Sequence, residues 1–204
     1  MFFVKPPYLA GKLYPLMKWR FPVNEKAIYL TFDDGPIPTV TPWVLDMLNR
    51  FNAKATFFCV GNNVSNYPGI YSDILENGHA TGNHTYHHLN GWKTATDTYI
   101  KNTEKCAELI NSSLFRPPYG RLKFSQYSLI AAQYSIIMWD VLSGDYNIKI
   151  TGEKCLQNII KNAKEGSIVV FHDSLKAENN LKYALPKVLE YYSEKGFEFK
   201  AISN

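Results

Sequence analysis

From residue 27 to the C-terminus, short apolar runs alternate with stretches in which apolar residues recur every three or four positions. The apolar runs are rich in β-branched and aromatic residues and predict buried strands, while the periodic stretches predict helices with one face on a core. The predicted strands are 27–32, 55–60, 79–83, 114–116, 135–139, 167–171 and 197–202, and the predicted helices are 39–51, 63–77, 96–111, 124–133, 152–164 and 181–194. This alternation is typical of an α/β protein with a parallel sheet, and units of roughly 25 residues are compatible with a closed or nearly closed barrel.

Residues 1–26 do not follow this alternation. They carry basic residues, with no acid before Glu25, interleaved with aromatic and aliphatic side chains. Four prolines prevent a long amphipathic helix. We therefore predict an N-terminal arm, residues 1–26, packed on a domain of residues 27–204. The less favoured interpretation is a membrane-surface contact, because basic and aromatic residues interleave in such segments.

Composition narrows the function classes. The chain has 204 residues, 46% hydrophobic and 20% charged, which fits one globular domain and excludes a disordered chain. A dispersed net charge of +4 is too weak to indicate nucleic-acid binding. Three cysteines without a C-x-x-C pair argue against a disulfide framework or a thiolate zinc site.

Residues 1–7 do not resemble a secretory signal, and no stretch approaches the ~20 apolar residues of a membrane span. We therefore expect a cytoplasmic protein, with peripheral membrane association through the arm as the alternative.

Polar residues able to do chemistry gather just after the predicted strands. These segments are Asp33-Asp34, Gly61-Asn62, His84–His88, Arg116–Tyr119, Asp140–Asp145 and His172-Asp173. Because the carboxyl ends of parallel strands meet at one end of a barrel, the segments are expected to share one face. This coincidence, more than any single motif, predicts an active site.

The histidine cluster suggests a metal centre. His84 and His88 are four residues apart, so one helical turn would put both imidazoles on the same side. Two imidazoles and one carboxylate form a catalytic metal set that leaves positions open for water and substrate. Asp34 or Asp33 would supply the carboxylate, and the other acid would act as a base. His87 is not expected to be a ligand. Zinc suits these ligands, although cobalt, nickel or iron would also fit.

The remaining segments supply candidate partners. Arg116 could hold a carboxylate in bidentate geometry, and a backbone N–H near Tyr119 could bind an oxyanion. His172 is a candidate proton donor that Asp145 could orient and charge. We also consider three aromatic residues as sugar-stacking candidates: Tyr86, Trp92 and Tyr146.

Five of these segments occur in the order of a known family. They are Thr31–Pro36, His84–His88, Arg116–Tyr119, Trp139–Tyr146 and Val170–His172. Over residues 27–202 the sequence resembles the NodB-homology polysaccharide deacetylases, carbohydrate esterase family four. The resemblance implies a distorted (β/α)7 barrel, here with an N-terminal extension. It also implies metal-dependent removal of acyl groups from sugars.

The resemblance assigns residue roles. Asp33 would be the general base, buttressed by Arg116, and Asp34 would bind the metal with His84 and His88. The backbone N–H of Tyr119 would stabilise the oxyanion. His172 would be the general acid, tuned by Asp145, and Val170 would line the acetyl pocket. The family pattern has Asp where this chain has Leu142, Trp where it has Tyr146, and Leu where it has Val170. None of these departures removes a catalytic group, but the change from Trp to Tyr146 is expected to alter the shape of the substrate groove.

The expected function is therefore metal-dependent hydrolysis of N-acetyl or similar acyl groups on an amino sugar or an N-acetylglucosamine-containing glycan. The alternative is a deformylase or amidohydrolase that acts on a lipid-linked aminosugar or a small cyclic amide. A carbohydrate-binding domain without catalysis is a third interpretation. The sequence argues against it, because every catalytic position is filled.

Overall fold

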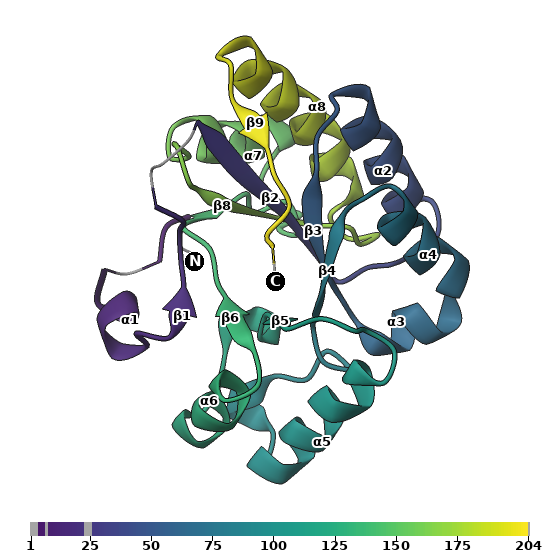
Figure 1. The fold of residues 1–204 in the computed structure, drawn as a ribbon. Coiled ribbons are helices and arrows are strands. Elements are labelled where there is room, and N and C mark those ends of the chain that lie inside the picture. The colour runs from purple at the N-terminus through teal and green to yellow at the C-terminus, as the bar shows by residue number, and fades with distance from the viewer. Residues whose placement is uncertain (1–3, 7, 23–25, 204) are drawn as a thin grey trace.

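The computed structural model describes residues 4–6, 8–22 and 26–203. Strand β2 (Ala27–Asp33) lies between β3 and β8 in a parallel sheet whose order is β1-β6-β5-β4-β3-β2-β8-β7, and β9 also pairs with β2. The other strands are β1 (Met17–Lys18), β3 (Ala55–Cys59), β4 (Ala80–Asn83), β5 (Leu114–Phe115), β6 (Ser135–Ile137), β7 (Val141–Leu142), β8 (Ile168–His172) and β9 (Glu198–Phe199). Figure 1 shows that the sheet curls into a barrel with helices around its outside. The predicted α/β architecture, a distorted barrel, is confirmed.

The helices follow the strands in the predicted alternation. They are α1 (Tyr8–Leu13), α2 (Val40–Arg50), α3 (Gly61–Asn66), α4 (Pro68–Glu76), α5 (Thr96–Ala107), α6 (Phe124–Ala131), α7 (Gly152–Ile160) and α8 (Glu178–Glu194), with short 3₁₀ turns η1 (Gly91–Lys93) and η2 (Pro118–Gly120). The single helix predicted over residues 63–77 is wrong. Tyr67 separates α3 from α4, because Pro68 disfavours a helical conformation at the residue before it.

Strand β2 is buried on both faces, and its two faces do different work. Ile28, Leu30 and Phe32 pack in the main core, where Phe32 stacks on Phe57 and Phe171 of the flanking strands. The alternate residues, including Thr31 and Asp33, therefore face the other side of the sheet, the barrel interior. The first acid of the motif is thus directed inward by strand periodicity.

The arm takes part in the sheet. Met17 and Lys18 of β1 pair in parallel with Ile136 and Ile137 of β6. Arg20 then forms an antiparallel bridge with Ser167, just before β8, so the chain passes from one part of the barrel wall to another. Figure 1 shows α1 and β1 beside β6. Among the described residues, the structure contains no helix both long enough and apolar enough to span a bilayer.

Candidate active site

The polar segments converge at one end of the barrel, as the sequence predicts. A cleft of about 860 Å³ opens there. Six of the predicted site residues, from three separate segments, line it: Asp33, Asp34, His84, His88, Val170 and His172. Asp33 and His172 also occupy paired positions on the adjacent strands β2 and β8. Sheet register therefore brings the expected base and acid side by side.

Three of these residues form a group able to hold a metal ion. One ligand atom from each of Asp34, His84 and His88 lies within 4.8 Å of the others. Asp34 Oδ1 is 3.1 Å from His88 Nε2 and 3.9 Å from His84 Nε2. Bonds of 2.0–2.1 Å around a tetrahedral ion place neighbouring ligand atoms roughly 3.3 Å apart, so the three residues fit a zinc-like cation. Among the described residues, Asp33 and His87 are not part of such a group.

The two histidines do not meet through a helical turn, which corrects the geometric reason given for their spacing. The segment His84–His88 is a loop after β4, and Thr85 and His88 have left-handed φ values of 61° and 53°. These turns bring the imidazole centroids to 5.0 Å. The i, i+4 spacing therefore indicated the two histidines that the structure brings together, but the helical turn expected between them is not present.

His84 is held in its neutral form, the form in which an imidazole can bind a metal ion. Its ring is buried, and burial lowers its pKa to about 4. Its Nδ1 lies 2.7 Å from the carbonyl oxygen of Arg116, a distance at which the neutral ring donates Nδ1–H to the carbonyl. This arrangement leaves Nε2 as the lone-pair nitrogen on the side of Asp34, and a backbone partner of this kind commonly fixes the tautomer of a metal-binding imidazole.

Asp34 is held ionised. Burial would raise its pKa, but the hydrogen bond with His88 and the charges of His172 and His84 outweigh burial and hold the pKa well below its ordinary value. Its backbone has a φ of 87°, a left-handed conformation that costs a non-glycine residue on the order of 1–3 kcal/mol. A negative carboxylate in an unusual backbone conformation is typical of a functional position.

Asp33 makes a different contact. Its Oδ1 accepts a 2.7 Å bond from Nη1 of Arg116, which is completely buried. The other guanidinium N–H groups donate to Thr31 Oγ1, Ile137 O and Met138 O. The expected bidentate pairing is therefore wrong, because most of the Arg116 donors bind backbone and hydroxyl oxygens. A single bond to Asp33 fixes one carboxylate oxygen and leaves the other outside this pairing.

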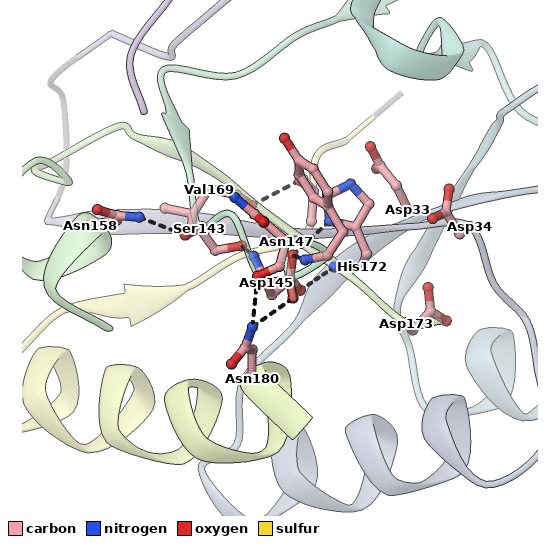
Figure 2. A network of polar contacts seen from close by, with 12 residues as sticks. Asp33, Asp34, Ser143, Asp145, Asn147, Asn158, Val169, His172, Asp173 and Asn180 are labelled. Carbon is pink, nitrogen blue, oxygen red and sulfur yellow. Dashed lines mark hydrogen bonds and ion pairs between the residues drawn. The ribbon is translucent and has the colours of Figure 1, made fainter. Parts of the chain in front are cut away.

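His172 and Asp145 form the second charged pair. His172 Nδ1 lies 2.8 Å from Asp145 Oδ1, and the backbone N–H of His172 donates to Asp145 Oδ2 at 2.7 Å. Burial acts to lower the pKa of His172, but Asp145, together with the charges of Asp34 and Asp33, raises it to about 9. Figure 2 shows Asn180 of α8 reaching the Asp145 loop, where it donates to the Asp145 carbonyl. Asp145 is thus anchored from two sides.

The aromatic candidates separate into two groups. Trp92, Tyr119 and Tyr146 line the cleft, and Trp92 and Tyr119 are 59% and 60% exposed. Tyr86 does not line it. Its ring packs against the main core under the ammonium of Lys105, so the structure does not support a sugar-stacking role for Tyr86. Leu142, the departure from the family pattern, pairs with Val170 and also lines the cleft.

The structure adds residues that sequence reasoning missed. Asp173 is buried, which raises its pKa to about 8, and it touches the loop that carries Asp34. From the arm, Pro6, Tyr14, Met17 and Trp19 line the cleft. The position of Asp173 directly after His172 was the available signal. No spacing signal marked the arm residues, because their place depends on how β1 pairs with β6.

This fold and site define a class: an α/β-barrel hydrolase with a candidate two-histidine, one-carboxylate metal centre flanked by two charged pairs. Comparison with known proteins agrees. Residues 21–135 match the family described as polysaccharide deacetylase. A peptidoglycan-N-acetylglucosamine deacetylase of Bacillus cereus is 35% identical over 192 residues, covering 91% of this chain and 90% of that protein.

Two further relatives extend the match. A chitooligosaccharide deacetylase of Azorhizobium caulinodans is 36% identical over 163 residues, covering 76% of this chain and 77% of that protein. The crystal structure of a peptidoglycan N-acetylglucosamine deacetylase in complex with an N-oxidanyl-benzamide superposes with a TM-score of 0.89 at 31% identity, covering 97% of this chain and 95% of that one. The chain belongs to the polysaccharide deacetylase family, hydrolases that act on carbon–nitrogen bonds other than peptide bonds.

Proposed function

We propose that this deacetylase removes N-acetyl groups from N-acetylglucosamine residues of a carboxylate-bearing glycan, with zinc held by Asp34, His84 and His88. The observation that carries the proposal is that this group shares a cleft with two proton-transfer candidates, Asp33 and His172. Each candidate has its own buried partner. Family membership supplies the reaction class, and the arrangement of these residues supports their division into roles.

The three ligand residues fit a divalent cation by geometry and by charge. A neutral imidazole at His84 and an ionised Asp34 are the forms that bind metal. Imidazole and carboxylate together suit zinc among the abundant cations. Such an ion, when bound, lowers the pKa of a coordinated water towards ~7 and polarises a carbonyl oxygen.

Asp33 takes the proton from the attacking water. Arg116 holds its Oδ1 at 2.7 Å, on the barrel-interior side of β2, so this carboxylate stays apart from the metal group although it adjoins Asp34 in sequence. Held in this way, the Asp33 carboxylate does not coordinate the cation, and its second oxygen is available to accept the proton. The division of labour between two adjacent acids thus rests on one buried guanidinium.

Tyr119 and His172 complete the reaction. The backbone N–H of Tyr119, in the turn fixed by Pro117 and Pro118, stabilises the oxyanion, and one such donor is typically worth about 3–4 kcal/mol. His172 has a pKa of about 9, so its imidazole is protonated at neutral pH. Because Nδ1–H is engaged by Asp145, Nε2–H is the proton that His172 gives to the departing amine.

The charge of the cleft favours an anionic glycan such as peptidoglycan, which carries carboxylates on its peptide stems, over a neutral chitooligosaccharide. Among the described residues that line the cleft, the acids are Asp33 and Asp34, and the rim carries Arg121 and Lys176. The guanidinium of Arg121 lies 4.9 Å from the Trp92 ring, and the ammonium of Lys176 lies 5.9 Å from the Tyr146 ring. Each of these two positions on the rim thus combines an aromatic ring with a cationic side chain.

We also propose that residues 1–26 belong to the catalytic unit. The support is that Tyr14, Met17 and Trp19 line the cleft and that β1 is a strand of the barrel sheet. The arm would then shape the substrate site. The change in sequence pattern near residue 26 would not mark a boundary between separate functional units. A membrane contact through the arm stays a prediction.

The test is a substrate panel with the zinc-loaded protein. Acetate and formate release are measured from peptidoglycan fragments, chitooligosaccharides, a lipid-linked formylated aminosugar and a cyclic imide. We expect acetate release, highest on peptidoglycan fragments and abolished by a chelator. Formate release, or ring opening of the imide without acetate release, would instead establish the amidohydrolase alternative. Activity that a chelator leaves unchanged would refute the metal-dependent mechanism.

A further inference from the structure

Asp173 is a buried acid to which the mechanism above gives no task. It follows His172 directly at the end of β8 and is 1% exposed. It does not line the cleft. Figure 2 shows its carboxylate below Asp33 and Asp34, apart from the His172–Asp145 pair.

Asp173 contacts the chain on both sides of Asp34. Its backbone N–H donates to the carbonyl oxygen of Asp33 at 3.1 Å. Its Oδ1 accepts the backbone N–H of Gly35 at 3.0 Å. These two bonds hold the residue before the metal ligand and the residue after it, so Asp34 lies between two points fixed by one residue.

The carboxylate of Asp173 is itself fixed. Thr41 Oγ1 donates to Asp173 Oδ2 at 2.7 Å and accepts the backbone N–H of Ile37 at 2.9 Å. Thr41 lies in the first turn of α2 and is fully buried. The carboxylate therefore links the end of β8, the Asp34 loop and the start of α2.

The loop is built for this close approach. A Cβ added to Gly35 would lie 1.9 Å from Asp173 Oδ2 and 2.5 Å from its carboxyl carbon, so Asp173 leaves no room for a side chain there. Two further bonds hold the same loop: Asn63 Nδ2 donates to Asp34 O at 2.7 Å, and the Val60 N–H donates to Gly35 O at 2.9 Å. We call the set of hydrogen bonds that holds Asp33, Asp34 and Gly35 the strap. The left-handed φ of 87° at Asp34 is thus maintained by contacts to its neighbours and to its own carbonyl.

We propose that Asp173 is a positioning residue that holds Asp34 in the backbone conformation required to ligate the metal. The inference rests on the proposed role of Asp34 as a ligand. The strap acts on the backbone, so its effect should be seen in the affinity of the site for metal and in the protection of the Gly35 amide, before any substrate is present. A residue that merely stabilised the fold would leave both unchanged in protein that remains folded.

The test compares Asp173→Ala, Asp173→Asn and a matched control, Asp140→Ala. Asp140 is another partly buried acid that accepts bonds from Ser167 Oγ and the Ile168 N–H, but it does not line the cleft. Zinc affinity of metal-free protein is measured by competition with a chromophoric chelator, and Gly35 amide exchange is measured by NMR. We expect Asp173→Ala to weaken zinc binding about 10–100-fold, the range found for supporting partners of metal ligands, and to speed Gly35 exchange. Asp140→Ala should keep wild-type affinity.

The conservative variant separates hydrogen bonding from charge. The variant Asp173→Asn keeps an oxygen that can accept the Gly35 N–H, so its zinc affinity should stay within about threefold of wild type. Affinity as low as that of Asp173→Ala would assign the effect to charge and overturn the strap. Wild-type affinity in folded Asp173→Ala would overturn it as well.

A second variant keeps the inference testable if Asp173→Ala does not fold. Thr41→Val removes the donor that fixes Asp173 Oδ2 and should weaken zinc binding several-fold, whereas unchanged affinity would contradict the proposal. The failure of the proposed function looks different: in that case the wild-type protein would bind zinc no better than His84→Ala.

Discussion

The cleft has two sides that are built in opposite ways. The polar floor comprises Asp33, Asp34, His84, His88 and His172, all at or just beyond the carboxyl ends of strands. The apolar wall comprises Tyr14, Met17 and Trp19 of the arm with Met138 and Trp139 after β6. Several floor residues are fixed by hydrogen bonds to buried partners, whereas the wall residues share one hydrophobic cluster. We therefore expect the reaction to depend on individual hydrogen bonds in the floor, and substrate fit to depend on the packing of the wall.

This contrast has an energetic side. A buried guanidinium such as Arg116 is tolerated because Asp33 and three other oxygens accept its bonds, and removing one partner would leave a charge uncompensated. A wall residue that is truncated loses contact area but leaves no unsatisfied charge. We therefore expect floor variants to lose activity steeply and wall variants to change mainly the apparent affinity for substrate.

The largest expected effects lie in the floor and separate metal binding from proton transfer. His84→Ala should weaken zinc binding by more than about 100-fold, because a ligand matters more than its supporting partners. Asp33→Asn should keep zinc but lower kcat by about 10²–10⁴-fold, the usual contribution of a general base. Zinc titration and acetate release on the same samples check both. Full activity in Asp33→Asn, or wild-type zinc affinity in His84→Ala, would refute the division of roles.

The next effect is a displacement of the pH profile. As a general acid His172 must be protonated, so activity should fall as pH rises through its pKa. Asp145→Asn removes the main influence that raises this pKa above 6.5, while burial still lowers it. The alkaline limb of kcat/KM should therefore move to lower pH by roughly one unit or more. An unchanged limb would show that another group controls it.

The same pair gives a stability signature. Because the folded-state pKa of His172 is raised from 6.5 to about 9, the pair stabilises the fold fully below pH 6.5 and loses this contribution as pH rises through 9. Thermal unfolding of wild type and Asp145→Asn across this range measures it. The difference in Tm between the two proteins should shrink towards pH 10.

A smaller effect is expected in the wall. Trp19→Ala should raise KM by about two- to tenfold, the usual contribution of one aromatic contact, with kcat nearly unchanged. Leu129→Ala, on the exposed side of α6 and outside the cleft, is the control. A fall in kcat comparable to that of Asp33→Asn would erase the distinction between floor and wall.

The smallest effects belong to the rim cations. Arg121→Gln and Lys176→Gln should each lower kcat/KM on peptidoglycan fragments by about two- to fivefold, because exposed charges interact weakly through water. Added salt should reduce the effect. Neutral chitooligosaccharides should show no change, and an equal loss on both substrates would argue against recognition of carboxylates.

The floor was predictable from the sequence to a large extent. Acids and histidines at the ends of apolar runs, such as Asp33-Asp34 and His172, can be recognised as site candidates because strand ends converge in a parallel barrel. The local geometry was harder: His84 and His88 meet through left-handed turns that no periodicity reveals. The partner of Asp33 was named correctly, but the number of bonds from Arg116 depended on carbonyl oxygens that only the fold brings near.

The wall was not predictable. Met17 and Trp19 line the cleft because a two-residue strand pairs with β6, and so short a pairing leaves no readable pattern. Tyr86 shows the converse, since its place beside the histidine motif suggested a sugar contact, but its ring packs on the core under Lys105. Contacts between segments distant in sequence decided both cases.

The paired positions of Asp33 and His172 on β2 and β8 have a consequence for how such an enzyme can diversify. The spacing of the two residues is set by neighbouring strands of one sheet, about 4.8 Å apart, and not by the loops around them. Loops, rim and arm could therefore be exchanged or lengthened while Asp33 and His172, the proposed proton acceptor and donor, keep their separation. If these roles hold, one such pair could serve glycans of different shape, with specificity acquired at the periphery.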